Sequence, residues 1–168
     1  MSFNTQMSLD FRDFISATQT KNFILDDPIQ DWLKLYGETK GFKPNKSDNL
    51  FGNFIKKKGL EFEEHIVKML RNKHYFFEVQ QDLGNLEKYN LTKEKMKDGV
   101  PIIYQGLVIN FEEKLFGYPD LIVRNDYLDK ITNFKNTYPI QEEGNGWYYV
   151  VVDIKYSNLV FKRNKDTL

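Results

Sequence analysis

The sequence has 168 residues with 24 basic and 24 acidic side chains and a formal net charge of +0, so one domain with its own core is expected, and any binding to a polyanion must come from local basic patches. It contains no cysteine, which excludes disulfides, zinc–thiolate sites, thiol nucleophiles and Cys-ligated iron–sulfur clusters and leaves oxygen and nitrogen ligands for any metal ion. There is no apolar run near the ~20 residues of a bilayer span and no signal-peptide pattern, so we expect an intracellular protein, cytoplasmic or nuclear and not secreted, with no membrane partner.

Residues 1–50 predict a helical lead-in. Ser16 or Thr18 can cap a first helix, because hydroxyl side chains accept hydrogen bonds from the free N–H groups of a first turn. Asp27 followed by Pro28 predicts the start of a second helix, with Asp27 as the cap and Pro28 at the first helical position.

The second helix is expected to end at Gly37 and to bury Trp32 in the core. Residues 41–49 are polar and contain a proline, which predicts a loop. From Phe51 the pattern becomes helical again, with an apolar stripe at a spacing of three and four formed by Phe62, Ile66, Val67 and Leu70.

Two polar features accompany this long helix. Glu63 follows the spacing of the apolar stripe and is therefore the acid that should face the interior, whereas His65, two positions later, should lie on the surface. The run Lys56, Lys57 and Lys58 is the densest basic cluster in the chain. Such a run is usually a solvated helix face, and a weak phosphate contact is the alternative.

Strands are predicted at 75–79, 100–110 and 115–124, with a short helix at 92–98 between the first two. Proline is tolerated at the beginning of a strand, as at Pro119. Alternation places Asp120, Ile122 and Arg124 on one face of the third strand. Gln105 and Arg124 are weak candidates for substrate contacts, and Gln105 is expected instead to satisfy backbone groups.

The stretch Trp147–Lys155 reads as a buried strand entered through a glycine-rich turn. Asp153 and Lys155 share one face of it, while Ile154 points the other way. A carboxylate and an ammonium at the end of so apolar a strand need partners, which a metal ion and a phosphate would supply.

Three motifs then follow in order: Gly59-Leu60-Glu61-Phe62-Glu63 on a helix, Gly117-Tyr118-Pro119-Asp120 on a strand, and Asp153-Ile154-Lys155 on a later strand. This order and these contexts resemble the PD-(D/E)xK nuclease superfamily, and within it the RecB-like group. The resemblance covers most of the chain, though only the three motifs are specific. It implies one α/β domain over 1–168 with a restriction-endonuclease-like core, a small mixed β-sheet flanked by helices, behind the helical N-terminal segment.

The resemblance also implies a metal-dependent nuclease. Glu63, Asp120 and Asp153 would supply hard oxygen ligands for one or two Mg²⁺ or Mn²⁺ ions, together with the backbone carbonyl of Ile154. The metal would make a bound water more acidic and neutralise charge on the scissile phosphate. Lys155 would orient the attacking water or hold the phosphate, and its carboxylate neighbours should keep it protonated.

Several alternatives stay open. RecB-like nucleases usually carry a Gln-x-x-x-Tyr helix soon after the Asp-x-Lys strand, and no such motif follows Lys155, so the chain is either a fragment or lacks this helix. DNA is favoured as the substrate; an RNA endonuclease of the cap-snatching type, which can use a helix histidine such as His65, is a second reading. A non-catalytic nucleic-acid-binding or assembly module with the same fold is a third. A larger polypeptide or a helicase or polymerase partner would suit the family.

Overall fold

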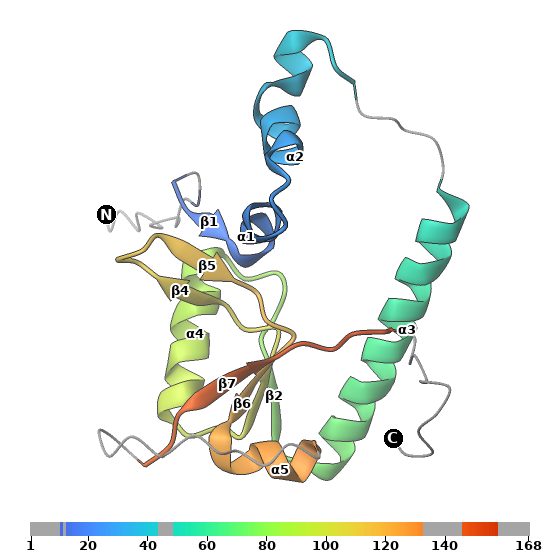
Figure 1. Ribbon diagram of the computed structural model, residues 1–168. Coiled ribbons are helices and arrows are strands. Elements are labelled where there is room, and N and C mark those ends of the chain that lie inside the picture. Colours follow the sequence, from blue (N-terminus) through green and yellow to red (C-terminus); the bar gives the residue numbers. More distant parts are fainter. Residues whose placement is uncertain (1–10, 12, 44–48, 133–145, 158–168) are drawn as a thin grey trace, which may run out of the picture.

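The computed structural model of the chain describes residues 11, 13–43, 49–132 and 146–157. These residues form a mixed α/β structure with two small mixed sheets and five α-helices (Figure 1). None of the helices in the described ranges has both the length and the apolar character that crossing a lipid bilayer requires.

The elements follow one another in an irregular alternation of helices and short strands. Their bounds are β1 Ile15–Ser16, α1 Ala17–Ile24, α2 Pro28–Trp32, the π-helical turn η1 Leu33–Gly37, the 3₁₀ turn η2 Glu38–Lys40, α3 Leu50–Lys73, β2 Phe76–Glu78, α4 Asn85–Lys97, β3 Ile102–Tyr104, β4 Val108–Asn110, β5 Leu115–Gly117, β6 Leu121–Arg124, the 3₁₀ turn η3 Asn125–Tyr127, α5 Leu128–Ile131 and β7 Tyr149–Val152. The short helix expected at 92–98 is thus the second half of the longer α4.

The N-terminal lead-in begins with a strand before its helices. Ser16, the predicted cap, ends β1 and caps α1: its Oγ accepts from the Gln19 N–H at 3.2 Å, and its own N–H donates to Gln19 Oε1 at 2.7 Å. The second helix begins at Pro28 as predicted, although the side chain of Asp27 makes no capping hydrogen bond to the backbone of the helix.

Two predictions for this lead-in are wrong. Helical structure continues past Gly37 and ends at Gly41, whose φ of +84° is the left-handed conformation that glycine adopts at no steric cost. Trp32 is 41% exposed, and its ring lies against those of Tyr36 and Phe42, because the helix after Pro28 leads away from the sheets (Figure 1).

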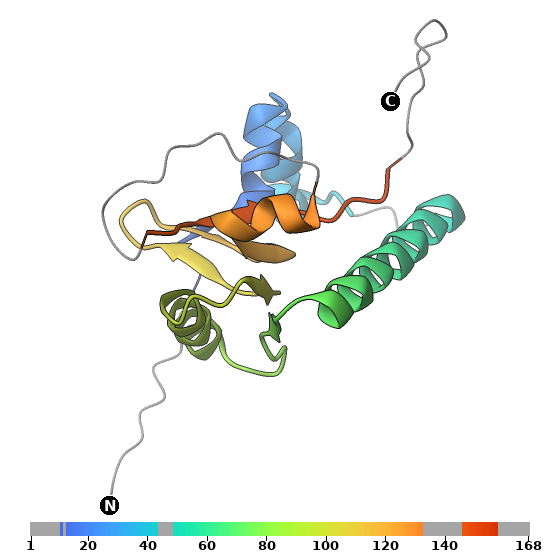
Figure 2. The ribbon, with the colours of Figure 1, turned by 90° about the horizontal axis from the view of Figure 1, so that it is seen from below.

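The long helix α3 starts where Asn49 Oδ1 accepts from the Gly52 N–H at 2.8 Å. Its predicted apolar stripe is buried only in its second half: Val67 and Leu70 are buried, whereas Phe62 is 37% exposed. The core therefore meets the C-terminal part of α3. The N-terminal part extends beyond the sheet (Figure 2).

Two long strands predicted from the sequence are each broken in the middle. Residues 100–110 form β3 and β4, and residues 115–124 form β5 and β6, with the two members of each pair in different sheets. The first break lies at Gln105, which has a φ of +52°, and the second at 118–120, which contains Pro119. The N–H of Gln105 donates to the carbonyl of Asp120 at 3.0 Å, so the two breaks lie against each other.

The larger sheet has the strand order β2-β3-β6-β7 and carries the core on both faces. On one face α3 and α5 contribute to a cluster built on Leu70, Ile102, Leu121, Val123 and Leu128. On the other face α4 covers a second cluster of Val79, Val100, Ile103 and Ile122. The result is a three-layer arrangement, helices–sheet–helix, in which β6 is buried on both sides (Figures 1 and 2).

The strand around which the sequence motifs centre is not buried. Among the described strands β7 pairs only with β6, at the edge of the sheet, and Val151 is 58% exposed. The run of β-branched residues suits an edge strand as well as a central one, so the pattern could not distinguish them. The smaller sheet, of order β1-β5-β4, joins the larger one at the two strand breaks.

Candidate functional site

The fold brings Asp120 and Asp153 together at the point where the strands break. Leu121 pairs with Val152 across β6 and β7, which run antiparallel, so the residues just outside this pair, Asp120 and Asp153, are neighbours. Each side chain comes from backbone that has just left the ladder, which frees its carboxyl group to point beyond the sheet.

Ile154 and Lys155 complete this group. The N–H of Ile154 donates to Asp120 Oδ2 at 2.6 Å, and Lys155 Nζ donates to Asp153 Oδ1 at 2.8 Å. The side chain of Ile154 packs against the first core cluster, on the opposite side from Lys155, as the alternation predicted. The proposed role of the Ile154 carbonyl as a ligand stays a prediction.

The two carboxyl groups differ in their affinity for protons. Burial and a hydrogen bond with Asp153 raise the pKa of Asp120 to about 6, against an opposing effect of the Ile154 N–H. The Lys155 ammonium lowers the pKa of Asp153, and Asp153 in turn raises the pKa of Lys155. Near neutral pH the group therefore holds a charged Asp153 and Lys155 and an Asp120 that is easily protonated.

Glu63 reaches the same region from α3 and is held by a chain of side chains. Tyr104, the last residue of β3, donates its hydroxyl hydrogen to Glu63 Oε1 at 2.8 Å, and Gln105 Nε2 donates to the Tyr104 hydroxyl at 2.8 Å. Burial, followed by the bond to Glu63, raises the pKa of Tyr104 above its ordinary value, so the hydroxyl keeps its proton. The charge of Glu63 contributes to the raised pKa of Asp120, which places it within electrostatic range.

These residues offer a pair of carboxylates to a cation. In the described part of the chain, no three His, Asp or Glu side chains come close enough together to hold a metal ion by themselves. A pair still suits Mg²⁺ or Mn²⁺, since Mg²⁺ retains several waters and binds through one or two carboxylates plus a substrate phosphate. The donor chemistry fits such an ion at Asp120 and Asp153, and the participation of Glu63 stays a prediction.

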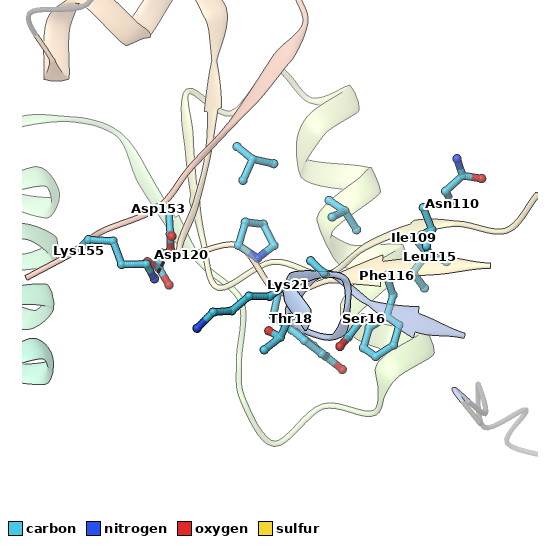
Figure 3. A pocket seen from close by; sticks show the side chains of 16 residues that line it. Ser16, Thr18, Lys21, Ile109, Asn110, Leu115, Phe116, Asp120, Asp153 and Lys155 are labelled. Carbon is cyan, nitrogen blue, oxygen red and sulfur yellow. Dashed lines mark hydrogen bonds and ion pairs between the residues drawn. The ribbon is translucent and has the colours of Figure 1, made fainter. Parts of the chain in front are cut away.

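A cavity of about 910 Å³ opens beside the carboxylate pair, between α1, the β4–β5 hairpin and β7 (Figure 3). Asp120, Asp153 and Lys155 form part of its wall. A second cavity, of about 650 Å³, lies between α3 and the sheet and is lined by Glu63, Tyr104 and Gln105. The candidate site thus has an opening on each side of the strand break.

Other residues that the sequence suggested lie elsewhere. Lys56 and Lys57 are exposed on the part of α3 that extends beyond the sheet, and Lys58 forms an ion pair with Glu61 at 2.6 Å. His65 is exposed, as predicted, and lines a separate shallow cavity of about 320 Å³.

Arg124 has a structural environment. It lies at the end of β6 opposite to Asp120, pairs with Asp126 at 2.6 Å, donates to the Gly99 carbonyl and packs over the ring of Trp147. These contacts fix the turn after β6, and together with a second bond to Asp126 they use three of the five guanidinium hydrogens.

The sequence reasoning did not single out Tyr104, Lys21 or Tyr118. The sequence pattern places Tyr104 only within a strand, and its position directly before Gln105-Gly106 is the available signal. Lys21 and Tyr118 line the cavity next to the carboxylates, and Lys21 comes from a helix that no motif connected with the site. Only the tertiary structure could bring these residues to Asp120.

Comparison of the chain with models of known protein families, with curated protein sequences and with solved structures found no match.

Proposed function

We propose that this chain is a metal-dependent nuclease of the PD-(D/E)xK superfamily, of the RecB-like kind, that hydrolyses phosphodiester bonds, with DNA as the favoured substrate. The observation that carries the proposal is the meeting of Asp120, Asp153 and Lys155 at the ends of β6 and β7, on the wall of one cavity. In the proposed assignment the larger sheet with α3 and α4 is the restriction-endonuclease-like core.

Each residue of this group has a role that follows from its contacts. Asp153 stays ionised because Lys155 lowers its pKa, so it offers a permanent carboxylate to a cation. Lys155 is 72% exposed on its side chain, stays protonated beside Asp153 and can hold or orient a phosphate as a point charge. Asp120 is fixed in direction by the Ile154 N–H.

Mg²⁺ or Mn²⁺, when bound at the pair, would supply charge neutralisation for the phosphate and a more acidic water. Asp120 and Asp153 would hold the ion, and Glu63 would add a third negative charge to the same region through its fixed bond to Tyr104. Lys155 is then placed on the side of Asp153 that faces the cavity, where a phosphate can approach it.

The direct test is cleavage of labelled single-stranded DNA, duplex DNA and RNA in Mg²⁺, Mn²⁺ or EDTA. We expect cutting that requires the metal and that falls about a hundredfold or more in Asp120→Ala, Asp153→Ala and Lys155→Ala. Glu112→Ala is the matched control, because Glu112 begins another Glu-x-Lys triplet and is exposed in the turn between β4 and β5. Metal-dependent cutting that survives all three site changes would refute the assignment.

One observation favours a second candidate, a non-catalytic nucleic-acid-binding module with the same fold. Among the described residues the carboxylates form a pair and not a group of three that could hold a metal ion alone. This candidate predicts that a folded wild-type protein binds nucleic acid without cutting it, and that neither EDTA nor Asp153→Ala changes the affinity.

A further inference from the structure

The cavity beside Asp120 has two chemically different parts. One end carries Asp120, Asp153 and Lys155, and Figure 3 shows these side chains grouped together. The remaining wall is largely apolar and aromatic, formed by Val108, Ile109, Leu115, Phe116, Pro119 and Val151. At about 910 Å³ it is near the upper end of the ~300–1,000 Å³ typical of ligand pockets.

A second cation enters this cavity from α1. Lys21 lies in the last turn of α1, and Figure 3 shows its side chain extending toward the end of the cavity where Asp120 and Lys155 lie. Within the described residues no carboxylate forms an ion pair with it, whereas Lys155 is paired with Asp153. Its charge is therefore available to an anionic ligand.

An aromatic ring lies on the same wall and is held in place. The hydroxyl of Tyr118 donates to Asn85 Oδ1 at 2.7 Å, and its ring meets Phe116 edge-on at 5.9 Å. The ammonium of Lys88 lies 5.9 Å from the ring centre. Tyr118 nevertheless stays 49% exposed, so a fixed ring surface is open to a ligand.

We propose that this cavity is a subsite for one unpaired nucleotide of a substrate strand, in which Lys21 contacts the phosphate next to the one at Asp120 and Tyr118 stacks on the base. This inference rests on the proposed nuclease function and specifies its substrate as a single strand or an unpaired end. A phosphate matches the cation, and a planar base matches the aromatic and apolar wall.

A duplex would not use the cavity in this way. Its bases are stacked and paired, so a base could enter the pocket only after unpairing and unstacking, which is unfavourable. The formal net charge of +0 also gives the chain no overall positive field that would attract a duplex through its two backbones. Among the described residues of its wall, Lys21 is a cation without an ion-pair partner and Tyr118 has a half-exposed ring, and these two match one nucleotide of a flexible strand.

The test measures binding separately from cleavage. Fluorescence anisotropy in EDTA, where metal-dependent hydrolysis cannot proceed, would compare a labelled ten-nucleotide oligo-dT with a labelled duplex of equal length on the full chain. We expect the single strand to bind at least tenfold more tightly. Thymidine monophosphate should compete only weakly, because it lacks the neighbouring phosphates.

Two variants separate the two contacts. Lys21→Ala should weaken oligo-dT binding several-fold. It should also reduce the steepness of log affinity against log salt by about 0.7, the value for one phosphate contact to a single strand. Lys21→Arg should retain the wild-type affinity and the wild-type salt slope. Tyr118→Ala should weaken binding about tenfold with an unchanged salt slope, and Tyr118→Phe should retain affinity because it keeps the ring. Lys97→Ala, on the exposed end of α4 and outside the cavity, is the control.

The outcomes distinguish this inference from the nuclease proposal. Tight, Lys21- and Tyr118-dependent binding of oligo-dT without cleavage in any metal would support the subsite and refute the nuclease. Metal-dependent cleavage with equal binding of duplex, or with wild-type affinity in both alanine variants, would support the nuclease and overturn the subsite. A monophosphate that competes as well as the oligonucleotide would also overturn it, because the cavity would then serve a small molecule.

Discussion

Asp120 occupies an environment that opposes its own charge. It is partly buried and lies beside Asp153, and the N–H of Ile154 only partly offsets these effects on its pKa. Carboxylates that accept no cation in such surroundings reduce the stability of the folded state. Residues of this kind are typical of functional sites, where geometry is maintained at the expense of stability.

Asp120→Asn is therefore expected to stabilise the protein in EDTA at pH 8 by about 1–2 kcal/mol, after allowing for partial exposure. The pKa of Asp120 is raised in the folded state to about 6 from 3.8, so the folded protein is most favoured when Asp120 is protonated. The stability that protonated Asp120 contributes to the folded state is present below about pH 4 and is lost as the pH rises through 6. Asparagine imitates the protonated acid and can still accept from Ile154.

Urea unfolding at pH 5 and pH 8 would measure this difference. The stabilisation should be larger at pH 8, and it should decrease when Mg²⁺ is added if the wild-type pair binds the ion. Glu112→Gln, an exposed carboxylate exchanged in the same way, should have little effect at either pH. A less stable Asp120→Asn protein at pH 8 would contradict the explanation.

Under the proposed function, Tyr104→Phe should reduce nuclease activity about tenfold while lowering the free energy of unfolding by only about 1 kcal/mol. The change removes the hydroxyl that donates to Glu63 and accepts from Gln105, and it leaves the ring in its place beside Phe76. Steady-state kinetics and thermal unfolding would be measured on the same sample.

Tyr149→Phe is the matched control for this experiment. Its hydroxyl also donates a hydrogen bond, to the Val100 carbonyl at 2.8 Å, but at the opposite end of the larger sheet. We expect a similar loss of stability with unchanged activity. Equal activity losses in the two variants would show that Tyr104 acts through general stability and not through Glu63.

At the scale of elements, the strand breaks build the site. Gly106 follows the left-handed Gln105, and a Cβ at this glycine would lie 2.7 Å from Ile122 Cδ1 and 3.0 Å from Thr92 Cγ2. Thr92 in turn accepts the Leu107 N–H at 3.0 Å, which attaches the corner to α4. The chain can change sheets here because α4 and β6 approach a residue without a side chain.

Gly106→Ala should destabilise the protein by about 1–3 kcal/mol, since the methyl group has no space in this contact. Gly59→Ala provides the opposite case, because nothing lies within 4 Å of a Cβ at that helical position. Alanine there should stabilise the protein by about 0.5–1 kcal/mol through its higher helix propensity. Chemical denaturation of both variants checks the pair, and a neutral Gly106→Ala would contradict the close approach.

On the scale of the whole molecule, the two faces of the larger sheet carry separate core clusters. Ile102 and Ile103 are adjacent in β3 and both fully buried, but one faces α3 and α5 and the other faces α4. Because one strand connects the clusters, we expect them to unfold together.

Ile102→Ala and Ile103→Ala should each cost about 2–5 kcal/mol and shift one common unfolding transition. Far-ultraviolet circular dichroism and intrinsic fluorescence, recorded during denaturation, should give coincident curves for both variants. Ile29→Ala, at a position 63% exposed in α2, should stay within about 0.5 kcal/mol of wild type. Two separate transitions would show that the faces are independent units.

The sequence predicted local features where local chemistry is decisive. The start of α2 follows from a proline at the first helical position, Pro28, and is confirmed. The inward position of Glu63 and the exposure of His65 follow from helical periodicity, and the opposite orientations of Ile154 and Lys155 follow from strand alternation; these are confirmed as well. It also predicted the mixed α/β class, and the pairing of β6 with β7 brought together the Asp120 and Asp153 that it had marked as candidates.

Features that depend on distant packing could not be read in advance. The breaks at Gln105 and Pro119 arise because the chain moves between two sheets, and the same hydrophobic alternation would suit an uninterrupted strand. The edge position of β7 and the exposure of Trp32 depend on which elements lack neighbours, which no local pattern encodes.

By itself, then, the sequence determined which residues are candidates for the site, because acidic and basic side chains at strand ends are costly unless they have partners. The tertiary structure alone decided what surrounds them: Tyr104 holding Glu63, and Lys21 and Tyr118 on the wall beside Asp120. The physical reason is that these neighbours come from α1, β3 and β5, and long-range packing, not sequence spacing, sets the distances between such elements.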